Sequence, residues 1–225
     1  MLQVSEDQLG RPVAHYGGIL KKGQCLDPQE DVEQLSSDTF LIHSGITVFP
    51  ELYLEGLWQA CKKRGVQLIL QKINFLQELA EFDQIILAAG AGIRHFPECR
   101  HLKINFVKGQ VLTCVLEKPL ERSIAGKRYQ ALTSSEQVCH LGSTYERDFT
   151  DEGPCKETAL ALLQPNTEVL DCQAAIRVTN PAHYFPIVEQ INPKTWVITA
   201  LGSRGLLYHA YLGKQFLKNL FLLNR

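Results

Sequence analysis

The sequence predicts a mixed α/β fold, and three observations lead to this prediction. The chain has 225 residues, of which 45% are hydrophobic and 21% charged, so it can bury a sizeable core. Helical periodicity and short apolar runs alternate in residues 45–95 and again near the C-terminus. Between them, residues 96–180 contain successive strand-like runs without regular helical crossovers. Such a pattern is typical of an antiparallel β-rich segment inserted between α/β pieces.

The first α/β piece begins with a helix. Pro50 suits a first helical turn, residues 54–61 place apolar side chains at i, i+3, i+4 and i+7, and Gly65 provides a stop. Residues 66–70 and 85–89 are then expected to form strands. The continuous apolar run of the second strand predicts burial on both of its faces.

The β-rich segment and the C-terminal piece follow. We predict strands at 104–117, 128–132, 137–146 and 168–179, a helix at 157–163, a strand at 195–201 and a helix at 206–222. The last helix is expected to pack through Leu206, Ala210, Gly213, Leu217 and Leu220, with Leu207, Phe216 and Phe221 beside them.

Charge, hydropathy and cysteine usage exclude several classes of protein. The net charge of −1 lacks the basic excess of a stand-alone nucleic-acid-binding protein. No apolar run approaches the ~20 residues of a membrane span, and the N-terminus has no secretory signal. The scattered cysteines show no metal-ligand spacing, so we expect no metal site and reduced thiols in a cytoplasmic protein. They are Cys25, Cys61, Cys99, Cys114, Cys139, Cys155 and Cys172.

The sharpest local signal is a strand–GSRG–helix segment at residues 195–222. A helix N-terminus offers free N–H groups and the positive end of its dipole, and Arg204 adds a permanent cation. The segment therefore suits an anionic or polarised ligand, but it equally suits an ordinary tight turn. The candidate binding residues here are Gly202, Ser203, Arg204, Gly205 and Leu206.

Two further features are candidates. The run ILAAGAG ends a predicted strand in small residues, where Ala89 and Gly90 let a ligand approach the backbone. The same run also suits a plain strand-to-loop junction. Arg177 lies among apolar neighbours, either paired with a structural carboxylate or aimed into a pocket to hold an anion. His183 lies on a Pro-flanked loop, where a hydrogen-bonding role is commoner than a catalytic one.

Six motifs follow one another in a characteristic order. They are GITVFPELYL at 45–54, DQIILAAGA at 83–91, KGQV at 108–111, GSTYE at 142–146, AIR at 175–177 and ALGSRGL at 200–206. In this order, over roughly residues 17–220, the chain resembles the FAD-dependent oxidoreductases of the D-amino-acid oxidase family. Within the family, KGQV, GSTYE and LGSRGL are most similar to the flavin half of the bifunctional enzyme that modifies the wobble uridine of tRNA.

The resemblance implies a flavin-binding α/β domain and a β-sheet substrate domain. The flavin-binding domain would comprise residues 45–95 and 181–225, and the substrate domain residues 96–180. Residues 1–44 would form a connector and a piece of the substrate domain.

The resemblance also implies the chemistry and the role of each candidate. FAD would take a hydride from a carbon next to an amine nitrogen. Residues 202–206 would lie near the pyrimidine edge of the flavin, and Ala89 and Gly90 along the cofactor. Arg177 would be the catalytic-site residue that holds a substrate anion.

The chain has no complete GxGxxG motif. The resemblance therefore implies that the family's N-terminal nucleotide-binding unit is missing, so we expect the chain to purify without FAD and to self-associate. The first hypothesis is an oxidoreductase acting on a small amine or amino-acid-like substrate, with tRNA a partner by resemblance alone and no membrane partner. The alternative is a flavin-free remnant that serves as a non-enzymatic binding module.

Overall fold

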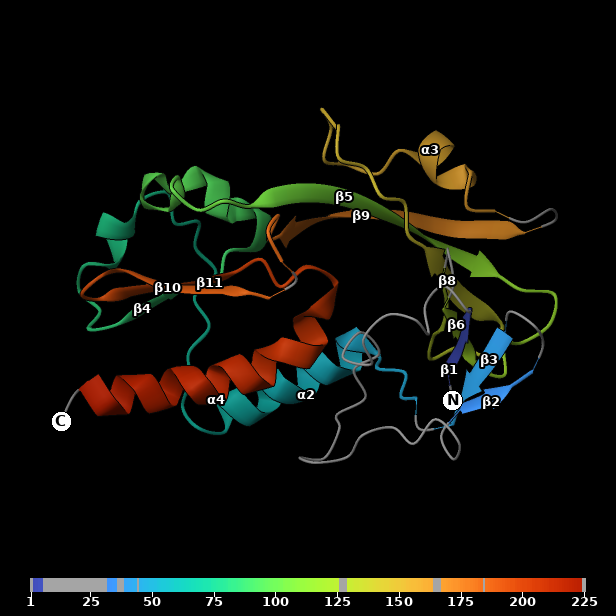
Figure 1. Ribbon diagram of the computed structural model, residues 1–225, viewed down its shortest axis with the longest axis horizontal. Coiled ribbons are helices and arrows are strands. Elements are labelled where there is room, and N and C mark those ends of the chain that lie inside the picture. Colours follow the sequence, from blue (N-terminus) through green and yellow to red (C-terminus); the bar gives the residue numbers. More distant parts are fainter. Residues whose placement is uncertain are drawn as a thin grey trace.

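The computed structural model describes residues 2–5, 32–35, 39–43, 45–125, 129–163, 167–183 and 185–223. In these residues the chain forms two β-sheets with helices packed around the smaller one, as Figure 1 shows. The mixed α/β class predicted from the sequence is confirmed. Cys25 and the greater part of the 1–44 connector lie outside the described residues.

The larger sheet has eight strands in the order β2-β3-β1-β6-β7-β8-β5-β9. Its strands are β1 (Leu2–Ser5), β2 (Val32–Gln34), β3 (Thr39–Ile42), β5 (Asn105–Val115), β6 (Ser123–Ala125), β7 (Tyr129–Leu132), β8 (Val138–Gly142) and β9 (Glu168–Thr179). Every neighbouring pair is antiparallel except β1 and β6. The antiparallel β-rich middle of the chain is thus confirmed, and β9 occupies the predicted range.

The register of the long β5–β9 pair assigns the two faces of this sheet. Val107 lies opposite Arg177 and Gly109 opposite Ala175. Because side chains alternate along a strand, these residues share one face, which we call the site face. The other face, the back face, is packed by α3 (Lys156–Leu160) and the residues that follow it. The buried residues there are Leu112, Cys114, Cys139, Leu141, Ala159 and Leu162.

The smaller sheet has three strands in the order β10-β11-β4. They are β10 (Ile187–Asn192), β11 (Thr195–Thr199) and β4 (Ile85–Leu87), with β4 parallel to β11. Three short 3₁₀-helices, η2 (Leu76–Leu79), η3 (Gly90–His95) and η4 (Pro97–Cys99), contribute to its core. Ile93 and Val197 are fully buried at its centre. The prediction that this strand is buried on both faces is wrong, because Ile86 of the edge strand β4 is 49% exposed.

Two helices run side by side beneath the smaller sheet (Figure 1). They are α2 (Pro50–Lys62) and α4 (Gly205–Leu223), and α4 directly follows the short helix η5 (Gly202–Arg204). Tyr53 and His209 join α2 to α4 through a 2.6 Å contact between Oη and Nε2. Trp196 of β11 meets Phe216 of α4 edge to face, with ring centroids 5.3 Å apart. The predicted helices and the stop at Gly65, which has a φ of 81°, are confirmed.

Three predictions about the helices and the segment after α2 are wrong in whole or in part. Residues 66–70 form no strand and are exposed throughout, because they run along the surface without a strand partner among the described residues. The predicted apolar face of α2 buries none of its side chains. On α4 the prediction is right in part, since Phe216 is buried as expected whereas Leu206 and Leu217 are half-exposed. Leu54, Leu57, Leu206 and Leu217 thus each leave 40% or more of their surface exposed.

Within the described part of the chain, no helix combines the length and apolar character needed to cross a bilayer.

Candidate functional site

Arg177 is held on the site face by the segment that follows β8. Its Nη2 donates to Oγ of Ser143 at 3.1 Å and to the backbone oxygen of Thr144 at 3.3 Å. Its guanidinium carbon lies 5.8 Å from the centroid of the Tyr145 ring. No carboxylate among the described residues pairs with it. Of the two roles that the sequence allows for Arg177, pairing with a structural carboxylate is therefore not observed among the described residues.

Gly109 makes room for this arginine. A Cβ at position 109 would lie 2.7 Å from Nη2 of Arg177 and 3.3 Å from the backbone oxygen of Thr144. Any side chain at position 109 would thus displace the guanidinium. The glycine of the KGQV motif is explained by this close approach.

Gly142 makes room for Tyr129 in the same way. A Cβ at position 142 would lie 2.9 Å from the ring and hydroxyl of Tyr129. Burial raises the pKa of Tyr129, and the positive charge of Arg177 partly lowers it again. The phenol and the guanidinium therefore act on one another across the site face, and Tyr129 stays a neutral hydrogen-bond donor near neutral pH.

A hydrogen-bond network on the back face fixes the segment that holds Arg177. The hydroxyl of Thr144 accepts from the backbone N–H of Gln110 at 2.9 Å and donates to Oε1 of Glu146 at 2.5 Å. Nε2 of Gln110 donates to the same Oε1 at 2.8 Å. Although burial raises the pKa of Glu146, these two hydrogen bonds and the charge of Lys108 lower it overall. Glu146 is therefore an ionised acceptor at neutral pH.

A cavity of about 460 Å³ opens beside Arg177, and we call it the arginine cavity. It extends from the ends of β5 and β9 to the turn before α4. Its lining residues include Asn105, Tyr145, Arg147, Arg177, Thr179, His183, Gly202, Ser203 and Arg204. The arginine and the GSRG turn, far apart in the sequence, thus face one space.

A second cavity of about 430 Å³, the glycine cavity, lies on the other side of the same turn. Gly90 and Gly202 both line it, with φ angles of 54° and 56° that favour glycine. Arg177 lines it too, so the cavity adjoins the arginine cavity. Thr199 also lines it, and its buried hydroxyl has no hydrogen-bond partner among the described residues.

A third cavity of about 480 Å³, the sheet cavity, continues along the site face away from Arg177. Tyr129, His140 and Gln173 line it from three strands, and Phe49 and Leu52 cover it from the start of α2. The site face therefore offers a ligand more room than the arginine cavity alone.

The structure brings most of the sequence candidates together, but not all of them. Arg177, Gly202, Ser203 and Arg204 line the arginine cavity, and Gly90 lines the glycine cavity. Three candidates line none of the three cavities. Ala89 packs partly buried against the core of the smaller sheet, Gly205 begins α4, and Leu206 is 50% exposed.

Sequence reasoning missed several residues of this site. Tyr129 gives no local signal, because only strand pairing places its ring over Gly142. Asn105 reaches the cavity through the β5–β9 register, and Arg147 through the segment after β8, where Glu146 bridges to Lys108. Gly109 and Thr144 belong to the quoted motifs KGQV and GSTYE, which could have indicated them.

Among the described residues, no three His, Cys, Asp or Glu side chains gather as a metal ion would require. All six described cysteines are free.

Comparison with known proteins places the chain in a family. The family model DAO, FAD dependent oxidoreductase, matches residues 4–218. No curated protein sequence matches the chain significantly.

Three similar solved structures cover only part of the chain. Glycine oxidase from Bacillus cereus ATCC 14579 is 16% identical over 55% of this chain, with a TM-score of 0.46. Iminodiacetate oxidase from Chelativorans sp. BNC1 is 18% identical over 56%, with a TM-score of 0.44. Fructosamine oxidase (Amadoriase II) from Aspergillus fumigatus is 13% identical over 60%, with a TM-score of 0.45. The matched regions span 38%, 39% and 38% of those three chains.

The family match extends from β1 to α4 and includes every motif that forms the arginine and glycine cavities. The chain therefore belongs to the DAO family of FAD-dependent oxidoreductases.

Proposed function

We propose that the protein acts in the FAD-dependent oxidation of a C–N bond in an amine or amino-acid-like substrate, with Arg177 holding the substrate carboxylate. One observation carries the proposal. The Arg177 guanidinium has no carboxylate partner among the described residues and lines both cavities beside the Gly202 turn. A partly buried arginine without an ionic partner is a natural seat for a carboxylate.

The residues at the glycine cavity fit a flavin. A Cβ at Gly90 would meet nothing within 4 Å, so the space beside this backbone is open. The buried, unpartnered hydroxyl of Thr199 lines the same cavity and could hydrogen-bond to a polar ring. Gly90, Thr199 and Gly202 would hold the cofactor there, with Arg204 nearby. When bound, FAD supplies the hydride acceptor that amine oxidation requires.

The chain's own residues would position the substrate. Arg177 would bind the carboxylate, and the neutral hydroxyl of Tyr129 would be available to donate to the same group. The positive end of the α4 dipole and Arg204 would stabilise negative charge that develops on this side during oxidation. In this arrangement residues 45–95 and 181–225 serve the cofactor, and residues 96–180 serve the substrate.

The resemblance of the motifs supports a larger amine substrate, a modified nucleoside within tRNA. A protein with this substrate would work in the cytoplasm. The sheet cavity could accommodate atoms beyond the reacting amine. The contrasting function, a flavin-free binding module, requires the same carboxylate site without oxidation.

Replacement of Arg177 tests the proposal. With added FAD and N-methylglycine as substrate, Arg177→Met should raise KM about ten- to a hundredfold, because a charge-assisted contact contributes about 1.5–3 kcal/mol. The Kd for FAD should change little. Arg100→Met is the matched control, since Arg100 is exposed and lines none of the three cavities. If Arg177→Met unfolds the protein without a KM effect in the folded fraction, Arg177 is only structural.

A further inference from the structure

The arginine cavity carries more positive charge than one carboxylate needs. Arg147, Arg177 and Arg204 all line it, and His183 lies at its edge. None of the described residues in its lining is an aspartate or glutamate. Arg147 and Arg177 thus present two guanidinium groups to a space of about 460 Å³, and the described part of its lining contributes no carboxylate.

Arg147 and Arg177 are held near each other by one aromatic ring. The guanidinium carbon of Arg147 lies 5.5 Å from the centroid of Tyr145, and that of Arg177 lies 5.8 Å from it. Cation–π attraction to the shared ring offsets part of the repulsion between the two cations. The ring thus keeps two positive charges at one end of the cavity.

The two arginines differ in how they are engaged. Arg177 uses one nitrogen to bind Ser143 and Thr144. Among the described residues, neither a hydrogen bond nor an ion pair engages the guanidinium of Arg147. Its five donors are therefore free to bind a ligand, in a fork that matches a carboxylate or a phosphate.

The guanidinium groups of Arg147 and Arg177 repel one another, and a ligand with two negative charges relieves this repulsion better than a ligand with one. We propose that the arginine cavity selects amine substrates that carry a second anionic group, a carboxylate or a phosphate, and that Arg147 binds this group. This inference rests on the proposed function, in which Arg177 binds the first carboxylate. Arg147 is then a specificity-determining residue at the outer part of the cavity.

Calorimetric titration of the full chain tests this selection without any need for turnover. Three probes share an N-substituted glycine unit: N-methylglycine has one carboxylate, iminodiacetate has two, and N-(phosphonomethyl)glycine has a carboxylate and a phosphonate. Each is titrated into the wild-type chain, Arg147→Met, Arg177→Met and the control Arg100→Met. Thermal melts of all four proteins check that each is folded.

The wild-type chain should bind iminodiacetate or N-(phosphonomethyl)glycine at least about tenfold more tightly than N-methylglycine. Arg147→Met should abolish this preference, because it weakens binding of the two probes with a second anionic group at least about tenfold more than binding of N-methylglycine, and Arg100→Met should change neither. Whichever dianion binds more tightly identifies the second group as carboxylate-like or phosphate-like.

Equal binding of all three probes by the wild-type chain, or an equal loss for all three in Arg147→Met, would overturn the inference. Failure of the proposed function has a different signature. In that case Arg177→Met would leave N-methylglycine binding unchanged, whatever Arg147→Met does to the dianions.

Discussion

Gly109→Ala is the smallest change that should damage the site without damaging the fold. The added Cβ would lie 2.7 Å from Nη2 of Arg177, well inside ordinary contact distance. The displaced atom is the far end of a flexible side chain, so the protein can adjust by moving the guanidinium rather than the sheet. The backbone oxygen of Thr144, 3.3 Å away, needs to yield only slightly.

The expected loss of substrate affinity follows from the hydrogen bonds that now orient Arg177. Nη2 donates to Ser143 and Thr144 at 3.1 and 3.3 Å, and a displaced guanidinium loses this alignment. A displaced guanidinium would lose about one charge-assisted hydrogen bond to the substrate carboxylate, which contributes about 1.5–3 kcal/mol. The KM or Kd of an amine that carries a carboxylate should therefore rise at least about tenfold. The free energy of unfolding should change by no more than about 1 kcal/mol.

Titration with N-methylglycine and urea denaturation measure the two quantities. Gly56→Ala is the matched control, because Gly56 lies in α2 and a Cβ added there would meet nothing within 4 Å. It should raise stability by about 0.5–1 kcal/mol and leave binding unchanged. A Gly109→Ala protein that binds N-methylglycine as well as the wild type would refute the role of this contact.

Three other predictions concern the back face and the exposed apolar surface. Thr144→Val should weaken N-methylglycine binding about three- to tenfold and raise the pKa of Tyr129 in an ultraviolet titration, whereas Thr144→Ser should restore both values. Burial, with a smaller effect of Cys114, raises the pKa of Cys139 from 9.0 to about 11. The neutral Cys139 thiol therefore contributes fully to the free energy of unfolding below pH 9, and this contribution is lost as the pH rises through 11. In Cys139→Ala the free energy of unfolding, measured by urea denaturation, should depend less on pH across this range. Leu70 is 91% exposed in an apolar run, and Leu70→Asp should lower the self-association seen by sedimentation velocity; an unchanged, fully monomeric wild type would contradict this.

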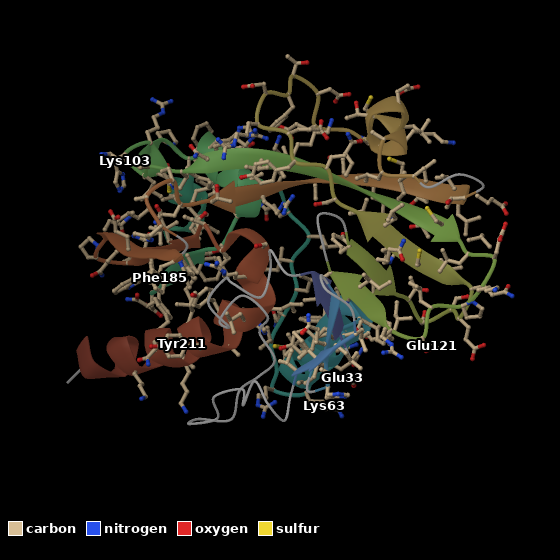
Figure 2. All side chains as sticks on the ribbon, turned by 45° about the vertical axis from the view of Figure 1, so that its right-hand side comes forward. Glu33, Lys63, Lys103, Glu121, Phe185 and Tyr211 are labelled. Atoms are coloured by element: carbon tan, nitrogen blue, oxygen red, sulfur yellow. The ribbon has the colours of Figure 1, made fainter. Side chains whose placement is uncertain are left out.

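Several other apolar side chains besides Leu70 are exposed. Leu68, Ile69 and Leu70 are all more than 60% exposed. Figure 2 shows Phe185 and Tyr211 on the same side of the molecule, the side of α4, and they are 62% and 58% exposed. Such a surface favours association in water.

Local patterns were sufficient for most elements of the fold. Pro50 and Gly65 mark the ends of the α2 segment because backbone geometry alone decides such positions. The strand at 168–179 was predicted to the residue because its β-branched and alternating side chains are local features. Residues 66–70 carry the same local signal but form no strand, since a strand also needs a partner with free backbone groups.

The candidate site was only partly predictable for a related reason. Arg177 and the Gly202 turn stand out locally, because a cation among apolar residues and a GSRG run between a strand and a helix can both be recognised from neighbouring residues. Tyr129 and Arg147 become site residues only through sheet pairing and a turn after β8, which no local pattern encodes. Ala89 was selected as part of a small-residue run, yet its methyl group serves the core instead.

Anaerobic reduction of added FAD by N-methylglycine tests directly whether the protein supports oxidation of a C–N bond. The wild-type chain, saturated with FAD, should lose its flavin absorbance at roughly 450 nm when the amine is added. Arg177→Met should need about ten- to a hundredfold more amine for the same loss. No loss of absorbance in the wild-type chain would contradict the proposed oxidation, and the same dependence on amine concentration in Arg177→Met would contradict the role of Arg177.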